Sequence, residues 1–395
     1  MSHPEHADVL VVGGAIVGSS VATFLASRPD FDGRIVVVER DPTFRTSSTT
    51  LSAASIRLQF STPLNIEISR FGLEVVRHPD AWLAVDGQAP DVGFVENGYL
   101  FLATEAGIVT LESNHAVQRA LDVPVILLSP AELRARFPWI NADDLAGASL
   151  GTADEGWFDA HALLQGFRHR ARALGVAQHT GEVVAMDRDG SRIAGVRLAD
   201  GTRIGADWVV NAAGPRAAEV AAMAGIDLPV RPRKRNVYHF EAPVSLGAAP
   251  LTIDPSGVYV RPEGPSFLAG FSPHGADPDP DTLDLSVDRA PFESFVWPAL
   301  AHRIPAFDRV RLLDAWAGHY EVNTVDHNAI VGPHPEVGNL LFANGFSGHG
   351  LQQAPAVGRG LAEWIATGRY ETLDLSPLGY GRIARNEPIQ ELNVV

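Results

Sequence analysis

A short glycine-containing turn near the start of the chain has the spacing of a dinucleotide-binding site. Gly13, Ala15 and Gly18 form the pattern G-x-A-x-x-G. A pyrophosphate needs close backbone approach and a helix N-terminus that points at it, and glycine permits both because it has no side chain. Ala15 replaces the usual middle glycine, so we expect a methyl group near the phosphates. Glu39 follows about 20 residues after Gly18 and is placed to accept hydrogen bonds from a ribose diol, although Arg40 beside it complicates discrimination against a 2′-phosphate.

The segments that flank this turn predict the elements that position it. Residues 8–13 are almost all apolar and predict a buried parallel strand. Residues 15–27 predict a helix with its apolar residues roughly on one side, and residues 34–39 predict a second strand. Together they form a βαβ unit of the expected length.

Two later segments also pass from an apolar strand into a helix. Residues 207–214 lead into an Ala-rich helix that we expect to end near Gly225, and residues 338–345 lead through a glycine-rich turn into a helix at 351–367. Two Asp-Gly turns predict an antiparallel meander over residues 182–205. The pieces of the dinucleotide site therefore come from the beginning, the middle and the end of the chain.

Other segments predict a different kind of structure. The tripeptide at 96–98, Glu-Asn-Gly, lies between apolar runs and predicts a hairpin. Residues 229–320 are rich in strand-forming residues and proline, and the Asp- and Pro-rich residues 276–281 predict a surface loop. We expect these segments to build a mixed α+β substrate domain.

Composition excludes several classes of function. The formal net charge of −16 over 395 residues disfavours binding to nucleic acid. No apolar run is long enough to span a membrane, and the first residues lack the pattern of a signal peptide, so we expect a soluble protein. The absence of cysteine excludes disulfides, thiol catalysis and iron–sulfur clusters. Lys234 is the only lysine, which disfavours Schiff-base chemistry.

Three further motifs point to a family. They are the Ser/Thr run at 46–50, the Asn-Ala-Ala-Gly segment at 211–214 and the glycine-rich turn at 345–350. With the first glycine turn, this set resembles the D-amino-acid-oxidase superfamily of flavoproteins, which includes sarcosine and glycine oxidases. Within it, the C-terminal third resembles most closely a mitochondrial branch linked to assembly of respiratory complex I. The resemblance covers almost the whole chain.

The resemblance implies an α/β fold with a Rossmann-like FAD-binding domain of the glutathione-reductase type, built from discontinuous segments, and a mixed α+β substrate domain. The implied boundaries are 1–85, 150–228 and 322–395 for the FAD-binding domain, and 86–149 and 229–321 for the substrate domain. Relatives with covalent flavin use a late Cys or an early His. Because the chain has no Cys and no His between His6 and His78, we expect noncovalent FAD.

The resemblance also implies which residues hold the cofactor. Val183 occupies the position at which the family pairs adenine with backbone groups. Residues 348–352 would bring a helix N-terminus close to the flavin N1–C2 carbonyl, where it would stabilise the negative charge of the reduced ring. The full set is Gly13, Ala15, Ile16, Val17, Gly18, Glu39, Arg40, Ser47, Ser48, Thr49, Thr50, Val183, Ala213, Gly214, Gly348, His349, Gly350, Leu351 and Gln352.

The implied reaction is oxidation of the carbon–nitrogen bond of a small amine or an N-methyl or unmethylated amino acid. A hydride goes to flavin N5, and water hydrolyses the imine. Arg57 matches a position that binds the substrate carboxylate, with a structural salt bridge as the alternative. Gln352 stands where relatives have a second, lysine partner, and Arg261 where they have a lysine that assists oxygen. Arg261 therefore favours a dehydrogenase over an oxidase.

The remaining candidates lie on strands that should border the pocket. Tyr238 and Tyr320 complete the catalytic set with Arg57, Arg261 and Gln352. Because side chains alternate along a strand, only one of the neighbours Tyr238 and His239 can face the pocket. Glu321 could favour a cationic substrate or point away. We expect no metal site, because the spacing of the histidines matches no common ligand motif; they are His319, His327, His334 and His349.

Two alternatives to an enzyme remain open. One is an assembly protein that keeps FAD for stability, and the other is the FAD subunit of a larger electron-transfer complex. The convergent polar set favours the enzyme, because an unused pocket needs no such groups. The expected partners are the amine substrate and O2 or another electron acceptor, with a homo-oligomer or a protein partner left open. We expect a cytoplasmic location, with peripheral association with a respiratory complex as the alternative.

Overall fold

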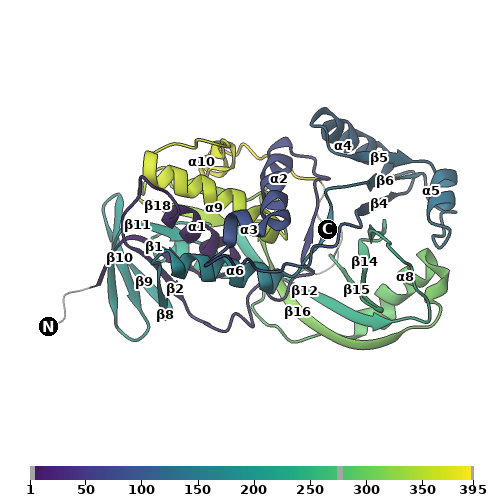
Figure 1. Ribbon diagram of the computed structural model, residues 1–395, viewed down its shortest axis with the longest axis horizontal. Coiled ribbons are helices and arrows are strands. Elements are labelled where there is room, and N and C mark those ends of the chain that lie inside the picture. The colour runs from purple at the N-terminus through teal and green to yellow at the C-terminus, as the bar shows by residue number, and fades with distance from the viewer. Residues whose placement is uncertain (1–4, 274–278, 393–395) are drawn as a thin grey trace.

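The computed structural model describes residues 5–273 and 279–392, and it contains two large sheets (Figure 1). The first has eight strands, in the order β17-β18-β11-β1-β2-β8, with β10 and β9 added beside β11. Its strands are β1 (Glu5–Val12), β2 (Ile35–Glu39), β8 (Ala177–Thr180), β9 (Val183–Asp189), β10 (Arg192–Leu198), β11 (Arg203–Asn211), β17 (Ile330–Pro333) and β18 (Leu340–Asn344).

The central strands of this sheet are parallel, which confirms the α/β prediction. Strand β1 pairs in parallel with β2 and with β11, and β11 pairs in parallel with β18. Val9 and Val11 pack on one face of the sheet, and Leu10 and Val12 pack on the other. A strand buried on both faces needs apolar residues throughout, which explains the continuous apolar run in the sequence.

Helices cover this sheet and are assembled from distant parts of the chain. They are α1 (Ile16–Ala26), α2 (Pro63–Arg77), α3 (Pro79–Leu83), α6 (Ala160–Ala173), α7 (Ala217–Ala222), α9 (Gly350–Thr367) and α10 (Gly381–Ala384). Figure 1 shows the N-terminal α1 beside the C-terminal α9, in purple and yellow. No helix in the described part of the chain is long and apolar enough to cross a membrane.

The second sheet also has eight strands, in the order β16-β12-β15-β14-β13-β4-β6-β5. They are β4 (Tyr99–Ala103), β5 (Val125–Leu128), β6 (Gly147–Gly151), β12 (Val230–Glu241), β13 (Leu251–Ile253), β14 (Val258–Glu263), β15 (Ser266–Phe271) and β16 (Arg311–Asn323), accompanied by helices α4 (Ile108–Ala120), α5 (Pro130–Arg136) and α8 (Trp297–Arg303). A short pair, β3 (Ser55–Ile56) and β7 (Gly156–Trp157), makes a third sheet. The short 3-10 and π turns are η1 (Gly214–Arg216), η2 (Phe292–Val296), η3 (Pro305–Phe307) and η4 (Ser376–Leu378). The expected division into two domains stays a prediction.

Most of the expected local structure is present. The three passages from strand to helix occur where we expected them, and the meander at 182–205 is the antiparallel set β9, β10 and the start of β11. The helix after β11 is shorter than expected, because η1 precedes it and α7 ends at Ala222. Of the loop expected at 276–281, residues 276–278 lie outside the described residues.

The expected hairpin at 96–98 is wrong. Val95 pairs with Trp157, whereas Tyr99 begins β4, which pairs with β6 and β13. Gly98 has a φ of +82°, and a Cβ there would lie 2.3 Å from the carbonyl oxygen of Gly151. The Asn-Gly signal therefore marks a turn in which the chain leaves the short β-bridge and enters the second sheet.

Helices α1 and α9 cross closely at Gly358. A Cβ at this position would lie 2.2 Å from Ser20 Oγ and 2.7 Å from the Ser20 carbonyl carbon. The Ser20 hydroxyl donates to the carbonyl oxygen of Ala354 at 2.8 Å, which ties the two helices together. Because Gly358 leaves no space, the crossing cannot accept a side chain without a shift of the backbone.

We expect Gly358→Ala to lower the free energy of unfolding by about 1–3 kcal/mol, the usual cost of overpacking. Urea unfolding followed by circular dichroism measures this change. Gly338→Ala is the matched control, because a Cβ at Gly338 meets nothing within 4 Å. Equal unfolding midpoints for the two variants would contradict the close crossing of α1 and α9.

Candidate functional site

One large cavity joins the two sheets. Its empty volume is about 1860 Å³, including part of its open mouth. It lies at the carboxyl ends of β1, β2 and β11, the usual ligand position in an open α/β sheet. It continues to residues of β12, β14 and β16 in the second sheet.

The first glycine turn forms one end of this cavity. Gly13 has a φ of +99°, and a Cβ there would lie 2.3 Å from the carbonyl oxygen of Ala212 on the neighbouring strand. A Cβ at Gly18 would lie 1.9 Å from the carbonyl oxygen of Gly13. Ala15, the residue directly before α1, lines the cavity, and so do Ile16 and Val17, the first two residues of α1. The turn therefore presents bare backbone and a helix N-terminus, as an anion site requires.

Glu39 lies at the end of β2 and lines the same cavity. Its two carboxylate oxygens accept the backbone N–H groups of Gly14 and Asp41, each at 2.8 Å. A carboxylate oxygen has two lone pairs, so each can accept a further donor. Arg40 and Val183 also line this end of the cavity.

The Ser/Thr run at 46–50 borders the middle of the cavity. Ser47, Ser48 and Thr49 line it, and Thr49 Oγ1 accepts the backbone N–H of Ile16 at 3.4 Å. Thr50 lies outside the lining set and donates its N–H to Ser47 Oγ at 3.2 Å. Ser48 Oγ is buried and has no hydrogen-bond partner among the described residues. Because Ser48 also lines the cavity, this hydroxyl is a candidate to form a hydrogen bond with a ligand.

The second glycine turn presents the N-terminus of α9 to the cavity. Gly348 has a φ of +97°, and a Cβ there would lie 2.6 Å from the ring of Tyr320. Gly348, Gly350 and Leu351 line the cavity, as do Ala213 and Gly214 after β11.

A buried polar cluster lies behind the N-terminus of α9. Burial and the nearby Arg57 lower the pKa of His349 to about 3, so its ring is neutral. The Arg57 guanidinium lies 2.9 Å from His349 Nε2 and donates to the carbonyl of Gln59, and Gln352 Oε1 accepts the Arg57 backbone N–H at 2.7 Å. Arg57, His349 and Gln352 are absent from the residues that line the cavity, so their expected ligand contacts stay predictions.

Two other substrate candidates also lie outside the lining set. Arg261 donates from Nε and Nη2 to the carbonyl oxygen of Ala53, at 3.2 and 3.1 Å. Tyr238 packs in the apolar core, where its hydroxyl donates to the carbonyl oxygen of Asp288 at 2.9 Å. The expectation that Tyr238 or His239 borders the pocket is not met, because β12 lines the cavity with Arg235 and Val237 instead.

The strands contribute further polar groups that were not among the predicted site residues. Arg235 lines the cavity, and its guanidinium lies 5.3 Å from the centre of the Tyr320 ring. Tyr320 lines the cavity as expected, and His319 and Glu321 beside it do so too. The available signals were the segment Trp316-Ala317-Gly318, which precedes them, and the basic residues of β12, namely Arg231, Arg233, Lys234 and Arg235. Strict alternation of side chains along β16 would have placed either Tyr320 or its two neighbours, His319 and Glu321, on the cavity, but not all three.

His319 and Glu321 carry buried atoms that await a partner. His319 Nε2 and Glu321 Oε2 make no hydrogen bond within the described chain. Burial raises the pKa of Glu321 to about 8, opposed by the backbone N–H groups of Gly345 and Phe346. Burial likewise lowers the pKa of His319. Both groups are therefore predominantly neutral at pH 7.

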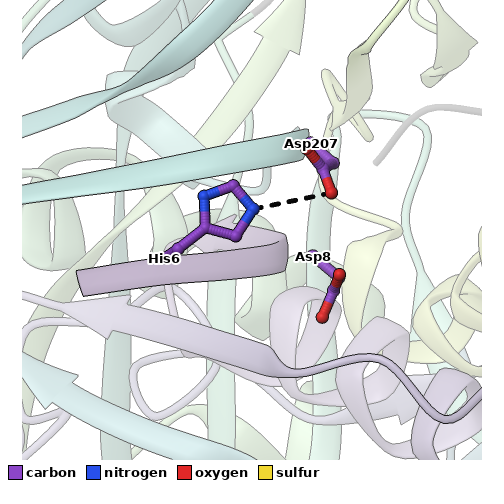
Figure 2. A group of neighbouring side chains, drawn as sticks. All are labelled: His6, Asp8 and Asp207. Carbon is purple, nitrogen blue, oxygen red and sulfur yellow. Dashed lines mark ion pairs between the residues drawn. The ribbon is translucent and has the colours of Figure 1, made fainter. Parts of the chain in front are cut away.

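The four histidines weighed as metal ligands do not come together. Within residues 5–273 and 279–392, the group with ligand geometry is His6, Asp8 and Asp207 (Figure 2). His6 and Asp207 are each 56% exposed and lie 3.5 Å apart. The Asp8 carboxylate accepts the backbone N–H of Arg34 at 2.6 Å. The group lies towards the start of β1, whereas the cavity lies beyond the other end of that strand.

Comparisons with known proteins agree with this geometry. A family model described as DAO, FAD dependent oxidoreductase, matches residues 8–364. FAD-dependent oxidoreductase domain-containing protein 1 of Xenopus laevis is 42% identical over 99% of this chain and 85% of its own length. Glycine oxidase of Geobacillus kaustophilus is 28% identical, over 95% of this chain and 97% of its own. The crystal structure of L-proline dehydrogenase from P. horikoshii has a TM-score of 0.85 at 27% identity and covers 98% of this chain and 100% of its own.

The raised pKa of Glu321 predicts a pH-dependent stability. The folded state holds this proton more tightly than the unfolded state, whose carboxyl titrates near 4.5. The contribution is therefore complete below about pH 4.5 and is lost as the pH rises towards 8. We expect Glu321→Gln to match the wild type below about pH 4 and to exceed its free energy of unfolding by a few kcal/mol at pH 8. Urea unfolding across this range tests the expectation, and a constant difference would contradict it.

Proposed function

The chain belongs to the DAO family of FAD-dependent oxidoreductases, and from that premise we propose that it oxidises the carbon–nitrogen bond of a small amine or amino acid, N-methyl compounds included. The family membership confirms the predicted cofactor, FAD. The observation that carries the proposed reaction is the single cavity that joins the dinucleotide turn to the polar groups of the second sheet. A protein that kept FAD only for stability would not need the part of the cavity that the second sheet lines with polar groups.

The residues at the dinucleotide end fit FAD. Gly13 and Gly18 leave the backbone bare, and the N-terminus of α1 faces the cavity beside them. At the middle of the cavity, the Ser48 hydroxyl, which has no partner among the described residues, supplies a further hydrogen-bonding group. Glu39 would hold the ribose, and the N-terminus of α9 would stabilise negative charge on the ring. When bound, FAD supplies the acceptor for two electrons and a hydrogen, which no amino-acid side chain can provide.

The proposed reaction needs a neutral amine. The substrate loses a hydride from its α or N-methyl carbon and a proton from nitrogen, and water adds to the resulting imine to give a carbonyl compound and an amine or ammonia. His319 lines the cavity and is neutral at pH 7, and its buried Nε2 has no partner among the described residues, so it is our candidate to accept the ammonium proton. Glu321 is predominantly neutral at pH 7, so it places little fixed negative charge that would hold an ammonium ion.

The names of several relatives support this class of substrate. They include glycine oxidase and, at 27% identity over 93% of this chain and 40% of its own length, sarcosine dehydrogenase of Mus musculus. We propose a dehydrogenase rather than an oxidase. The position of the oxygen-assisting lysine is Arg261 here, and the only lysine, Lys234, donates to Asp284 at 2.9 Å and lies outside the cavity lining.

Anaerobic addition of substrate should bleach the flavin. We expect at least one member of a panel of amines, amino acids and N-methyl amino acids to reduce the flavin at a rate typical of an enzyme, on the order of once per second or faster. Admission of air should then reoxidise the reduced flavin slowly, whereas an artificial electron acceptor should reoxidise it quickly. Rapid stoichiometric hydrogen peroxide would contradict the dehydrogenase proposal. Complete failure of the panel, with a partner protein co-purifying, would favour the assembly role.

Denaturation should release all the FAD. A thioether link is excluded because the chain has no cysteine. Acid precipitation should therefore leave a colourless pellet and a yellow supernatant. His319 is the one histidine among the residues that line the cavity in the described chain, so His319→Ala is the control. Colour that remains in the wild-type pellet and disappears from this variant would overturn noncovalent binding.

A further inference from the structure

Residues 279–288, here named the strap, run along strand β12 and are held to it by charge. Asp279 accepts two hydrogen bonds from the Arg235 guanidinium, at 2.8 and 3.0 Å. The Asp284 carboxylate lies 2.9 Å from Lys234 Nζ. The four basic residues within 231–235 of β12 are therefore all paired with acidic residues of the strap.

The far end of the strap is also fixed. The carbonyl oxygen of Asp288 accepts the Tyr238 hydroxyl at 2.9 Å, and the Asp288 N–H donates to Asn236 Oδ1 at 3.3 Å. The strap is thus attached to β12 at both ends, and its middle is held by Lys234.

This attachment places two apolar side chains on the cavity. Leu283 and Leu285 both belong to its lining, although their neighbours on the strap are largely charged or polar. Val287, two residues further on, is 37% exposed and lies outside the lining set. The strap therefore presents two of its apolar residues to the cavity and leaves a third in solvent.

The second sheet provides apolar surface to the same cavity. Val237 on β12 and Tyr259 on β14 both line it, and both pair with Gly270 on the intervening strand β15. A Cβ at Gly270 would lie 2.5 Å from the Tyr259 hydroxyl, so the glycine gives the Tyr259 ring the space it occupies.

We propose that Leu283 and Leu285 determine specificity by forming, with Val237 and Tyr259, an apolar subsite for a substituent of several carbons on the substrate amine. This inference rests on the proposed function and narrows its substrate class. Arg235, which also lines the cavity, is already engaged by Asp279. Leu283, Leu285, Val237 and Tyr259 therefore offer methyl groups and a ring to a ligand. Each methylene buried there should raise affinity about fourfold.

The test uses the FAD-loaded full-length protein and a straight-chain series: glycine, alanine, 2-aminobutyrate, norvaline and norleucine, with their N-methyl forms. Binding is measured by perturbation of the flavin absorption spectrum, and reaction by the anaerobic rate of flavin reduction. In the wild type, affinity should rise about fourfold for each added carbon until the subsite is full.

Leu283→Ala and Leu285→Ala should weaken norleucine binding by about tenfold and leave glycine binding unchanged. Val287→Ala is the matched control on the same strap and should behave as the wild type. Leu283→Phe, which keeps the strap apolar, should shift the preferred chain to a shorter one. Equal wild-type affinity for glycine and norleucine, or equal effects of Leu283→Ala and Val287→Ala, would overturn the subsite.

The two measurements separate this inference from the proposed reaction. Graded binding without flavin reduction would support the subsite and contradict amine oxidation. Flavin reduction without any dependence on chain length would support amine oxidation and contradict the subsite.

Discussion

The backbone of Gly13 lies against the carbonyl of Ala212, and the rest of the cavity depends on this contact. It is possible only because β1 and β11 are parallel and end at the same level, with Val12 opposite Asn211. A side chain at position 13 would separate these strand ends. The close fit positions three groups at one edge of the sheet: the N-terminus of α1, the carboxylate of Glu39 and the segment that follows β11.

The features that depend only on residues close together in the sequence could be predicted from it. The apolar run before Gly13, the acid at Glu39 and the apolar helix after Gly350 each follow from neighbouring residues alone. The hairpin expected at 96–98 was wrong because the same Asn-Gly turn serves a different partner: Gly98 approaches Gly151, which is distant in the sequence. Local signals identify a turn, but they do not say which strands it joins.

The substrate side was harder to predict for a related reason. Whether Val237 or Tyr238 faces the cavity depends on which layer covers each face of β12. Tyr238 and Phe240 share the face that packs into the apolar core, whereas Val237 shares the more polar face with Arg235. Arg57 is polar and follows the Ser/Thr run at 46–50 closely in sequence, yet it is buried against His349 behind the N-terminus of α9. From the sequence, Glu321 was a candidate whose direction was open, and His319 was weighed only as a metal ligand. That both line the cavity and carry a buried atom without a partner in the described chain is a property of the fold.

The first sheet joins segments from distant parts of the chain, so it cannot be completed early in folding. Strand β1 pairs with β11, α1 packs on α9, and Ser20 bonds to Ala354. Contacts between residues so far apart close large loops and form slowly. On the ribosome, the FAD site therefore stays incomplete until α9 has emerged, so the cofactor can be enclosed only after all of these distant segments are present.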